Sequence, residues 1–496
     1  MQTAVFSAVT SDTWTIYWDK PDTAAPSCAY IIKTDGKNPL RVNRTHCTFA
    51  HLEPETDLHA EIWMNDEMIG TADARTLPKP RRINITEPPY SAIGNAIHLN
   101  TEKLQRAIDD CKDGEEIYIP KGVYLTGALR LHSNMSIYLE KGAVLQGTDR
   151  PEDYLPRIPS RFEGVERECY QSLLNLGDMD HDLEPTCRNV LIYGEGSICG
   201  GGQTLAMRII ESERERLKDY LASLGNKIKE YENEETIPGR ARGRLINLSN
   251  CENVRITGLT LRNGASWNLH MVYCRNILTD HCVFRSQGVW NGDGWGPDSS
   301  EMCTLFACEF HTEDDSVAIK SGKNPEGNVI NRPSRNIRIF DCISHQGHGI
   351  AIGSEISGGI ENISIWDCDL RYSLYGVLVK GTKKRGGYVR NVRVRDCVLP
   401  RFAVASALPY NDDGESAPTP PVFSDFTCER IHFTGWSREY WEDELHLMPC
   451  VDLSGYGEPG FEVQNVRISH CFVENCSEIH VKACKNVSID LSSAGT

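Results

Sequence analysis

The sequence lacks the features expected of a protein that binds nucleic acid or crosses a membrane. Its formal net charge is −17 over 496 residues, and it has no long basic stretch, so no nucleic acid partner is expected. No apolar run is long enough to cross a bilayer, so no membrane partner is expected. The N-terminal segment MQTAVFSAVTSDTWTIYW has no basic part followed by an apolar part. We therefore predict that it is not a signal peptide.

The sequence also lacks the cysteine patterns of disulfide-bonded and zinc-binding proteins. It has 19 cysteines, an odd number, whereas a secreted chain of this length more often carries few cysteines, in pairs. No C-x-x-C pair occurs, so no metal site is expected. We predict a reduced protein located in the cytoplasm.

What the sequence does contain is an internal repeat. Segments such as NIRIFDC (336–342), NISIWDC (362–368) and NVRVRDC (391–397) open with Asn, alternate β-branched residues and end in Cys six positions later. Short strands repeated every few tens of residues, with no helical pattern between them, predict a right-handed parallel β-helix. Equal offsets would then stack on neighbouring coils, and the cysteines would form an interior ladder.

Two segments differ from this repeat. Residues 1–83 are predicted to form a separate β-sandwich, because HLEPETDLHAEI (51–62) resembles a stretch of fibronectin type III domains. The predicted fold is therefore all-β, with this fibronectin type III-like unit at 1–83 and the β-helix at 84–496. A helical insertion is expected near 211–233, with Leu217, Leu221, Leu224 and Ile228 on one stripe. This insertion could be a solvated surface helix, form a wall of the cleft, or make a contact in a homo-oligomer.

The repeat register places an acid beside a histidine. Asp314 lies 12 residues after the opening Met302, and His348 lies 12 residues after the opening Asn336. We therefore expect Asp314 and His348 on adjacent coils, with Asp293 one coil earlier.

Asp315 poses a problem of side-chain direction, because in a regular strand it would point into the core with Val317 and Ile319. An unpaired carboxylate in an apolar core is very costly. Either the backbone bends between residues 315 and 317, or Asp315 is buried with hydrogen-bond donors.

The acidic segments resemble the signatures of glycoside hydrolase family 28, the polygalacturonases. The chain has NGD at 291–293, EDDSVAIKSGK at 313–323 and GHGIAIGSE at 347–355, and LVK at 378–380 stands where the family has R-I-K. The resemblance covers about residues 88–490, and KSGKNPEGNVINRPSRNIRI is similar to the bacterial exo-acting branch. It implies a β-helix enzyme that hydrolyses terminal galacturonic acid, or a related sugar, from pectic oligosaccharides with inversion and without a cofactor.

The resemblance also implies catalytic roles. Asp314 would be the general acid that protonates the leaving oxygen, while Asp293 and Asp315 would hold and deprotonate the attacking water. His348 would orient or tune the proton of the acid. In an inverting enzyme the acid and the base lie about 6.5–9.5 Å apart.

Lys380 is expected to pair with the carboxylate of a uronic acid. Trp295 would stack on a sugar ring or simply pack. The further candidates for substrate binding are Asn291, Lys320, Glu355, Lys384 and Arg385.

Two positions depart from the family pattern. Leu378 replaces the usual Arg, which removes a bidentate clamp for a carboxylate, and Gly296 stands where an Asp is usual. A modified galacturonide, a rhamnogalacturonan fragment or a different terminal sugar therefore stand beside polygalacturonate as substrates.

Two other functional classes remain as alternatives. A β-helix lyase of the pectate type would need calcium-binding acids and would give an unsaturated, ultraviolet-absorbing product. A catalytically silent carbohydrate-binding solenoid would bind sugar without turnover.

Overall fold

The chain divides into two compact units. A computed structural model describes residues 2–36, 38–182, 184–226, 239–406, 415–438 and 442–493. One unit comprises Met1–Arg82 together with Gly114–Glu116, and the other comprises Ile83–Asp113 with Ile117–Thr496. Each unit has its own hydrophobic core.

The N-terminal unit contains two antiparallel sheets. One sheet has the order β1 (Val5–Val9), β2 (Trp14–Trp18) and β5 (His46–Phe49), and the other has β4 (Leu40–Val42), β3 (Tyr30–Thr34), β6 (Asp57–Met64) and β7 (Glu67–Arg75). Trp14, Trp18, Tyr30 and Ile62 are buried between them. The fibronectin type III-like assignment of this unit stays a prediction.

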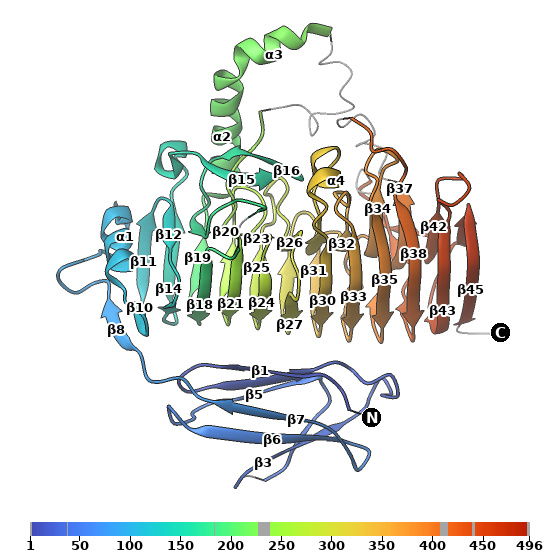
Figure 1. Cartoon of the computed structure of the whole chain (residues 1–496), viewed down its shortest axis with the longest axis horizontal. Helices are drawn as coiled ribbons and strands as arrows, with labels where there is room; N and C mark the ends of the chain where they lie inside the picture. The colour runs from blue at the N-terminus through green and yellow to red at the C-terminus, as the bar shows by residue number, and fades with distance from the viewer. Residues whose placement is uncertain are drawn as a thin grey trace. The chain divides into compact units, whose positions relative to one another are not determined.

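The larger unit is a parallel β-helix, which confirms the predicted all-β solenoid (Figure 1). Its strands form three long sheets along the coils.

The first sheet contains β8 (Arg81–Asn84), β10 (Glu115–Ile119), β13 (Met135–Leu139), β18 (Cys187–Gly194), β21 (Cys251–Thr257), β24 (Arg275–Asp280), β27 (Thr304–Phe306), β30 (Ser334–Phe340), β33 (Ile360–Trp366), β35 (Tyr388–Arg395), β38 (Val422–Glu429), β43 (Val463–Val473), β45 (Cys484–Ser493), β39 (His432–Phe433) and β36 (Val398–Leu399). The second contains β9 (Asn95–Leu99), β11 (Gly122–Thr126), β14 (Ala143–Gly147), β19 (Ser197–Cys199), β22 (Thr260–Arg262), β25 (Val283–Arg285), β28 (Glu309–His311) and β31 (Ile343–Gln346). The third contains β12 (Leu129–Leu131), β17 (Leu174–Leu176), β20 (Ile246–Ser249), β23 (Leu269–Val272), β26 (Trp295–Asp298), β29 (Val317–Ile319), β32 (Gly349–Ile352), β34 (Gly376–Gly381), β37 (Arg401–Ser406), β42 (Val451–Ser454) and β44 (Ile479–Lys482).

The opening asparagines of the repeats mark a corner of each coil. Asn276, Asn362 and Asn391 have φ between 54° and 59°, a left-handed conformation that Asn tolerates better than most residues. Their side-chain amides form a ladder: Asn391 Nδ2 donates to Asn362 Oδ1 at 2.6 Å, and Asn276 Nδ2 donates to Asn253 Oδ1 at 2.7 Å. The same offset therefore recurs in register from coil to coil.

The repeated cysteines are part of the solenoid core. Cys282, Cys308, Cys342, Cys368 and Cys397 are all buried, and the cysteines of the described ranges are free thiols. Burial of small apolar thiols explains their spacing without disulfide bonds.

Several helices and short strands lie outside the three long sheets. Helix α1 (Thr101–Asp110) buries Leu104, Ala107 and Ile108 and packs on β11 and β12, so it covers one end of the solenoid. A hairpin of β15 (Ile158–Phe162) and β16 (Val165–Cys169) follows the 3-10 helix Pro151–Tyr154. Helix α4 (Glu326–Ile330) and the antiparallel pair of β40 (Trp436–Ser437) and β41 (His446–Leu447) also lie outside the three long sheets.

The helical insertion begins earlier than predicted. Helix α2 (Gly202–Arg216) precedes α3 (Lys218–Leu224), and Figure 1 shows both projecting from the coils. The buried residues of α2 lie between Gly202 and Glu213, whereas α3 has none. The predicted stripe from Leu217 onwards is therefore not the packed face, and Ile228 lies outside the described residues.

None of the described helices is both long and apolar enough to cross a membrane.

Candidate active site

Four neighbouring strands of the third sheet bring the acidic segments together. Strands β26, β29, β32 and β34 lie side by side in parallel, as Figure 1 shows for β26, β32 and β34. Trp295 pairs with Val317, and Val317 pairs with Ile350. Because Asp293, Asp315 and His348 each lie two residues before one of these paired positions, they occupy neighbouring coils on one side of the solenoid.

The expected contact between Asp314 and His348 is present. His348 Nδ1 lies 3.1 Å from Asp314 Oδ1 and 3.3 Å from Asp315 Oδ1. The strand register aligns His348 with Asp315 rather than with Asp314, yet the imidazole reaches both carboxylates. The adjacency deduced from the repeat offset is therefore correct to within one residue.

Both carboxylates of the acidic pair face one pocket. Strand β29 begins only at Val317, so the regular alternation of side chains does not extend back to Asp315. Val317 and Ile319 point into the core, while Asp314 and Asp315 line the pocket. Asp315 is 3% exposed, and Lys380 Nζ lies 3.0 Å from its Oδ2. The chain therefore combines both predicted solutions, a change of backbone direction and burial against donors.

Further cations and acids complete this pocket, which we call the inner pocket. Lys320 Nζ lies 3.6 Å from Asp293 Oδ2 and 3.6 Å from Glu355 Oε1. Its ammonium group also lies 3.9 Å from the centre of the Trp267 ring. The lining side chains are those of Glu163, Arg240, Trp267, Asn291, Asp293, Asp314, Asp315, Lys320, Lys323, Ser354, Glu355, Lys380 and Arg385.

Lys320 and Lys380 reach the pocket from coils that are not adjacent. The register aligns Lys320 with Gly353 and Gly353 with Lys380. Gly353 has φ 107°, and a Cβ on it would lie 1.9 Å from the Lys380 carbonyl oxygen. Only glycine fits this rung, and Gly353 lines the pocket together with the two lysines.

The carboxyl groups of the pocket differ in proton affinity. Burial raises the pKa of Asp293 well above its usual range, and the charge of Asp314 raises it further, although Lys320 opposes the shift. Burial acts in the same direction on Asp314, but the charge of His348, its hydrogen bond and Lys380 hold the pKa of Asp314 well below its usual range.

The imidazole responds to the same charges. Burial lowers the pKa of His348, but the charges and hydrogen bonds of Asp314 and Asp315 outweigh this effect and raise the pKa to about 10. At neutral pH an imidazolium at His348 therefore faces the ionised Asp314, while Asp293 retains a proton to higher pH than an ordinary aspartic acid does.

A second, more open hollow adjoins the inner pocket. Asn291 and Asp314 line both spaces, and His348, Tyr372 and Arg438 line the outer one. Asp314 thus lies where the two spaces meet. A sugar chain threaded from one to the other would pass this carboxyl group.

The remaining predicted residues fall into two groups. Glu355 and Arg385 line the inner pocket, and Arg385 is held by Asn324 Oδ1 at 2.8 Å. Asn291 lines it as well, and its Oδ1 accepts a hydrogen bond from Arg242 Nη2 at 2.8 Å. Lys384 is half-buried and does not line either hollow.

The prediction that Trp295 stacks on a sugar ring is wrong. Trp295 is fully buried in the solenoid core, and its Nε1 donates to Thr279 Oγ1 at 3.0 Å. It packs, because its side chain belongs to the interior face of β26. The indole that does line the pocket is Trp267, which stacks on Phe162 with ring centroids 5.2 Å apart.

Arg240 and Glu163 are pocket residues that the repeat analysis did not find. Glu163 Oε1 pairs with Arg240 Nη2, while Nε and Nη1 of Arg240 are buried without a hydrogen-bond partner among the described residues. Arg240 follows the insertion, and Glu163 lies in the β15–β16 hairpin, so neither occupies a coil offset. The run RARGR at 240–244 was the one available signal.

The two positions that depart from the family pattern, Gly296 and Leu378, lie in one line of paired residues that runs across neighbouring strands of the third sheet. Gly296 is followed on successive strands by Ala318, Ala351 and Leu378. A Cβ on Gly296 would meet no heavy atom closer than 3.5 Å. The line is therefore small and apolar, and it carries no charged group where the family pattern has Asp and Arg.

Known proteins are similar to this chain in sequence and in fold. Residues 187–413 match the model of glycosyl hydrolases family 28. An exo-poly-alpha-D-galacturonosidase of Dickeya chrysanthemi is 29% identical over 410 residues, which is 78% of this chain and 66% of that protein, just under two thirds of its length. The structure of an exopolygalacturonase from Thermotoga maritima is similar with a TM-score of 0.69 and 25% identity, covering 84% of this chain and 92% of that one.

A family 28 exopolygalacturonase from Yersinia enterocolitica shares the fold over 99% of this chain and 97% of its own, with a TM-score of 0.79 and 22% identity. The matched segment 187–413 contains Asp293, Asp314, Asp315, His348 and Lys380. The part of the chain that is similar to glycosyl hydrolases family 28 is therefore the part that carries the candidate site.

Proposed function

We propose that this protein is an exo-acting, inverting glycoside hydrolase that releases terminal galacturonic acid from pectic oligosaccharides. The observation that carries the proposal is the inner pocket, where Asp293, Asp314 and Asp315 face each other among the cations Lys320, Lys380 and His348. Carboxyl groups with opposed proton affinities are what hydrolysis of a glycosidic bond requires.

Asp314 is the proposed general acid because it lies where the two hollows meet. A glycosidic oxygen positioned there would join a terminal sugar in the inner pocket to the rest of the chain in the outer hollow. Asp293 and Asp315, deeper in the pocket, would hold and deprotonate the attacking water. Deprotonated water attacks the anomeric carbon, and the leaving oxygen takes the proton of Asp314.

The order of the two proton affinities has to change before this reaction. The pKa of Asp293 is raised and that of Asp314 is lowered, which is the reverse of the proposed roles. A galacturonate carboxylate that binds Lys380 or Lys320 would neutralise part of the positive charge that keeps Asp314 ionised. Transfer of one proton from Asp293 to Asp314 then produces the base and the acid together, so substrate binding would prepare the site.

Recognition of the sugar carboxylate is assigned to the cations that remain in the pocket. Leu378 cannot supply the bidentate contact of the family's Arg. Arg240 lines the inner pocket with buried nitrogen atoms that have no hydrogen-bond partner in the described residues. A guanidinium N–H donates a strong, charge-assisted hydrogen bond to a carboxylate. We therefore assign Arg240 to the carboxylate of the terminal sugar, with Lys320 and Lys380 as supporting charges.

Exo action follows from the walls of the inner pocket. The β15–β16 hairpin contributes Glu163 to the wall. Arg161 of this hairpin pairs with Asp298 of β26 at 2.9 Å, and both side chains are fully buried. The backbone N–H of Lys323 also donates to the Gly164 carbonyl oxygen at 2.9 Å. A wall anchored in this way would stop a longer sugar chain from passing through.

The decisive experiment is product analysis with an oligogalacturonide labelled at its reducing end. The proposal predicts galacturonic acid and a labelled chain one unit shorter as the first products, detected by mass. Release of labelled fragments of several lengths would contradict exo action. A product absorbing in the ultraviolet would indicate the lyase, and sugar binding without turnover would indicate a binding protein.

Substrates with a modified terminal sugar are the second candidate. The uncharged line from Gly296 to Leu378 favours them, since it carries no charge where the family pattern has Asp and Arg. A panel with rhamnogalacturonan fragments and galacturonides carrying neutral substituents separates this from the first candidate. A higher kcat/KM on a modified substrate than on plain galacturonide would identify the modified sugar as the substrate.

We propose further that the N-terminal unit is fibronectin type III-like. The strand orders β1–β2–β5 and β4–β3–β6–β7 support a two-sheet sandwich of this kind. A cytoplasmic location, supported by the buried free thiols, is tested by fractionation of the native cells. A homo-oligomer, with α3 as the proposed contact, is tested by light scattering of the purified chain.

A further inference from the structure

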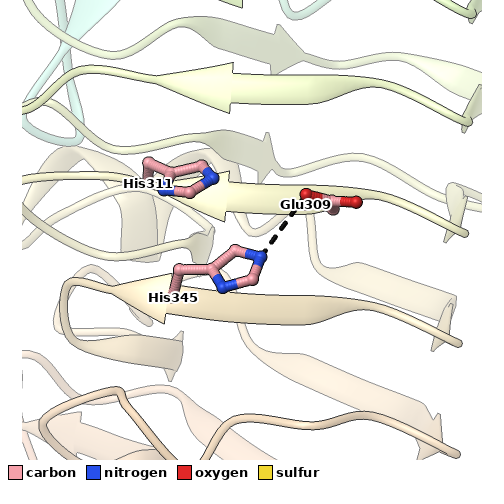
Figure 2. Close-up of side chains that lie close together, drawn as sticks. All are labelled: Glu309, His311 and His345. Atoms are coloured by element: carbon pink, nitrogen blue, oxygen red, sulfur yellow. Dashed lines mark ion pairs between the residues drawn. The ribbon is translucent and has the colours of Figure 1, made fainter.

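A second cluster of chemically active side chains lies outside both hollows. Glu309, His311 and His345 each place one ligand atom so that the three atoms lie within 4.8 Å of one another. Figure 2 shows the three side chains on two neighbouring strands. We propose that they form a binding site for a divalent transition-metal ion such as Zn²⁺. This inference is independent of the proposed hydrolase function.

The strand geometry places all three on the surface. Glu309 and His311 flank Phe310, which is 1% exposed and belongs to the core. Because side chains alternate along a strand, Glu309 and His311 both point away from the core on one face of β28. Their side of the sheet is therefore open to an ion from solvent.

A bulge in β31 supplies the third residue. Phe310 pairs with Ser344, but His311 pairs with Gln346, so His345 is an extra residue in its strand. A bulge redirects the side chain of the inserted residue. His345 Nε2 lies 3.4 Å from Glu309 Oε2, and its ring stacks on that of His311 with centroids 4.5 Å apart. The irregularity thus brings a second imidazole to the Glu309–His311 pair.

The donor set defines the class of ion. Two imidazole nitrogens and one carboxylate oxygen suit Zn²⁺, Co²⁺, Ni²⁺ or Cu²⁺, and leave a position for water. Mg²⁺ and Ca²⁺ prefer oxygen ligands and are not favoured here. The two imidazole rings are nearly parallel, at an interplanar angle of 14°. Each ring must therefore rotate before one of its nitrogens can bind a shared ion. The partly exposed side chains allow this rotation.

One neighbouring charge opposes a cation. Arg285 pairs with His311 on the preceding coil, so its guanidinium lies near the proposed site. Ligand bonds to the ion have to outweigh this repulsion. Transition-metal ions bind imidazole nitrogen, whereas alkaline-earth ions prefer oxygen, so a transition metal is the expected ion.

The site would link the two coils that carry the catalytic candidates. His311 precedes Asp314 by three residues, and His345 precedes His348 by three residues. An ion held by both histidines would cross-link β28 to β31 just before these segments. Metal binding should therefore raise the thermal stability of the β-helix.

Titration of the full chain with Co²⁺ at pH 7.5, after removal of metals with EDTA, tests the proposal. We expect saturable visible absorption with one ion per chain, and a Tm that rises on adding Zn²⁺. His311→Gln and His345→Gln should each weaken binding by at least about tenfold, because losing even an outer-shell partner costs about 10–100-fold. In EDTA both variants should match the wild-type Tm and circular dichroism.

Two control variants separate this site from others. His432→Gln removes a partly exposed histidine that pairs with Glu474 at 3.1 Å, without a second imidazole in that pair. This variant should bind Co²⁺ like the wild type. His348→Asn alters Asp314–Asp315–His348, the other such cluster in the described ranges. Loss of binding in His348→Asn alone, unchanged binding in both His311→Gln and His345→Gln, or no saturable signal at a large excess of Co²⁺ would overturn the proposal.

Discussion

At the residue scale, the central feature is the unequal sharing of protons in the inner pocket. Asp293 and Asp314 are both buried among charges, yet their pKa values move in opposite directions. The difference arises because His348 contacts Asp314, whereas Lys320 approaches Asp293 only to 3.6 Å. Proton position, rather than the number of acids, would therefore control activity.

Asp314→Asn removes the proposed acid while keeping the shape of the side chain. We expect kcat to fall by about 10²–10⁴-fold, the usual contribution of general acid catalysis, with KM changed only a few-fold. Steady-state kinetics on an oligogalacturonide measure both values. Asp369→Asn, which alters an acid paired with Arg371 at 2.8 Å, is the control and should keep wild-type kinetics. Near-normal kcat in Asp314→Asn would refute its role.

His348 should make the stability of the β-helix depend on alkaline pH. The folded-state pKa of about 10 lies above the ordinary value of 6.5, so its contribution is complete below about pH 6.5. That contribution is lost as pH rises from 6.5 towards 10. We expect Tm to fall more steeply over this window in the wild type than in His348→Asn. Equal slopes would show that the imidazolium is not stabilised by the two aspartates.

Arg240→Gln tests recognition of the sugar carboxylate. Loss of a charged hydrogen bond to a substrate typically costs about 1.5–3 kcal/mol, which corresponds to roughly a 10- to 150-fold loss of kcat/KM on a galacturonide. A substrate whose terminal carboxylate is reduced to an alcohol should be affected much less. If both substrates lose activity equally, Arg240 supports the fold of the pocket rather than the carboxylate.

At the element scale, the coil is defined by its corners. The corner asparagines combine a left-handed backbone with an amide ladder, and both favour Asn over other residues. This explains why the repeat could be recognised from spacing alone.

Asn362→Ala should lower the free energy of unfolding by about 1–3 kcal/mol, since Ala in the left-handed region costs roughly 1–2 kcal/mol and two ladder hydrogen bonds are lost. Asn362→Gly keeps the backbone conformation and should cost less. Chemical denaturation compares the two variants. A Gly variant less stable than the Ala variant would contradict this account of the corner.

The same element geometry explains where sequence reasoning stopped. Equal offsets predicted Asp314 beside His348, but the bulge at His345 adds one residue to its coil, and the acidic turn before Val317 adds two to the other. The coil offset therefore aligns His348 with Asp315. Such irregularities leave no mark on the Asn and Cys spacing.

Pocket residues outside the repeat were harder to predict. Glu163 belongs to a hairpin, and Arg240 follows the helical insertion, so their places depend on how long excursions fold back. Trp295 was misplaced because the glycine-rich segment around it gave no strand pattern, although β26 buries it in the core. The sequence periodicity thus locates the coils and the acidic residues on them. It does not locate the side chains that line the inner pocket from outside the coils.

At the scale of the whole molecule, an acidic chain carries a pocket with several cations. The net charge of −17 contrasts with Arg240, Lys320, Lys323, Lys380 and Arg385 around the inner pocket. A sugar carboxylate that enters this pocket would meet these cations where buried charges are screened little by salt. The location of the cations therefore supports the proposed anionic substrate.

The most direct measurement of the central claim is proton NMR of the first turnover of an α-linked galacturonide oligomer. The account predicts that free galacturonic acid appears first as the β anomer, before mutarotation, while no ultraviolet absorption develops. Initial release of the α anomer would contradict a water activated by Asp293 and Asp315 opposite the acid Asp314. An unsaturated product would contradict hydrolysis itself.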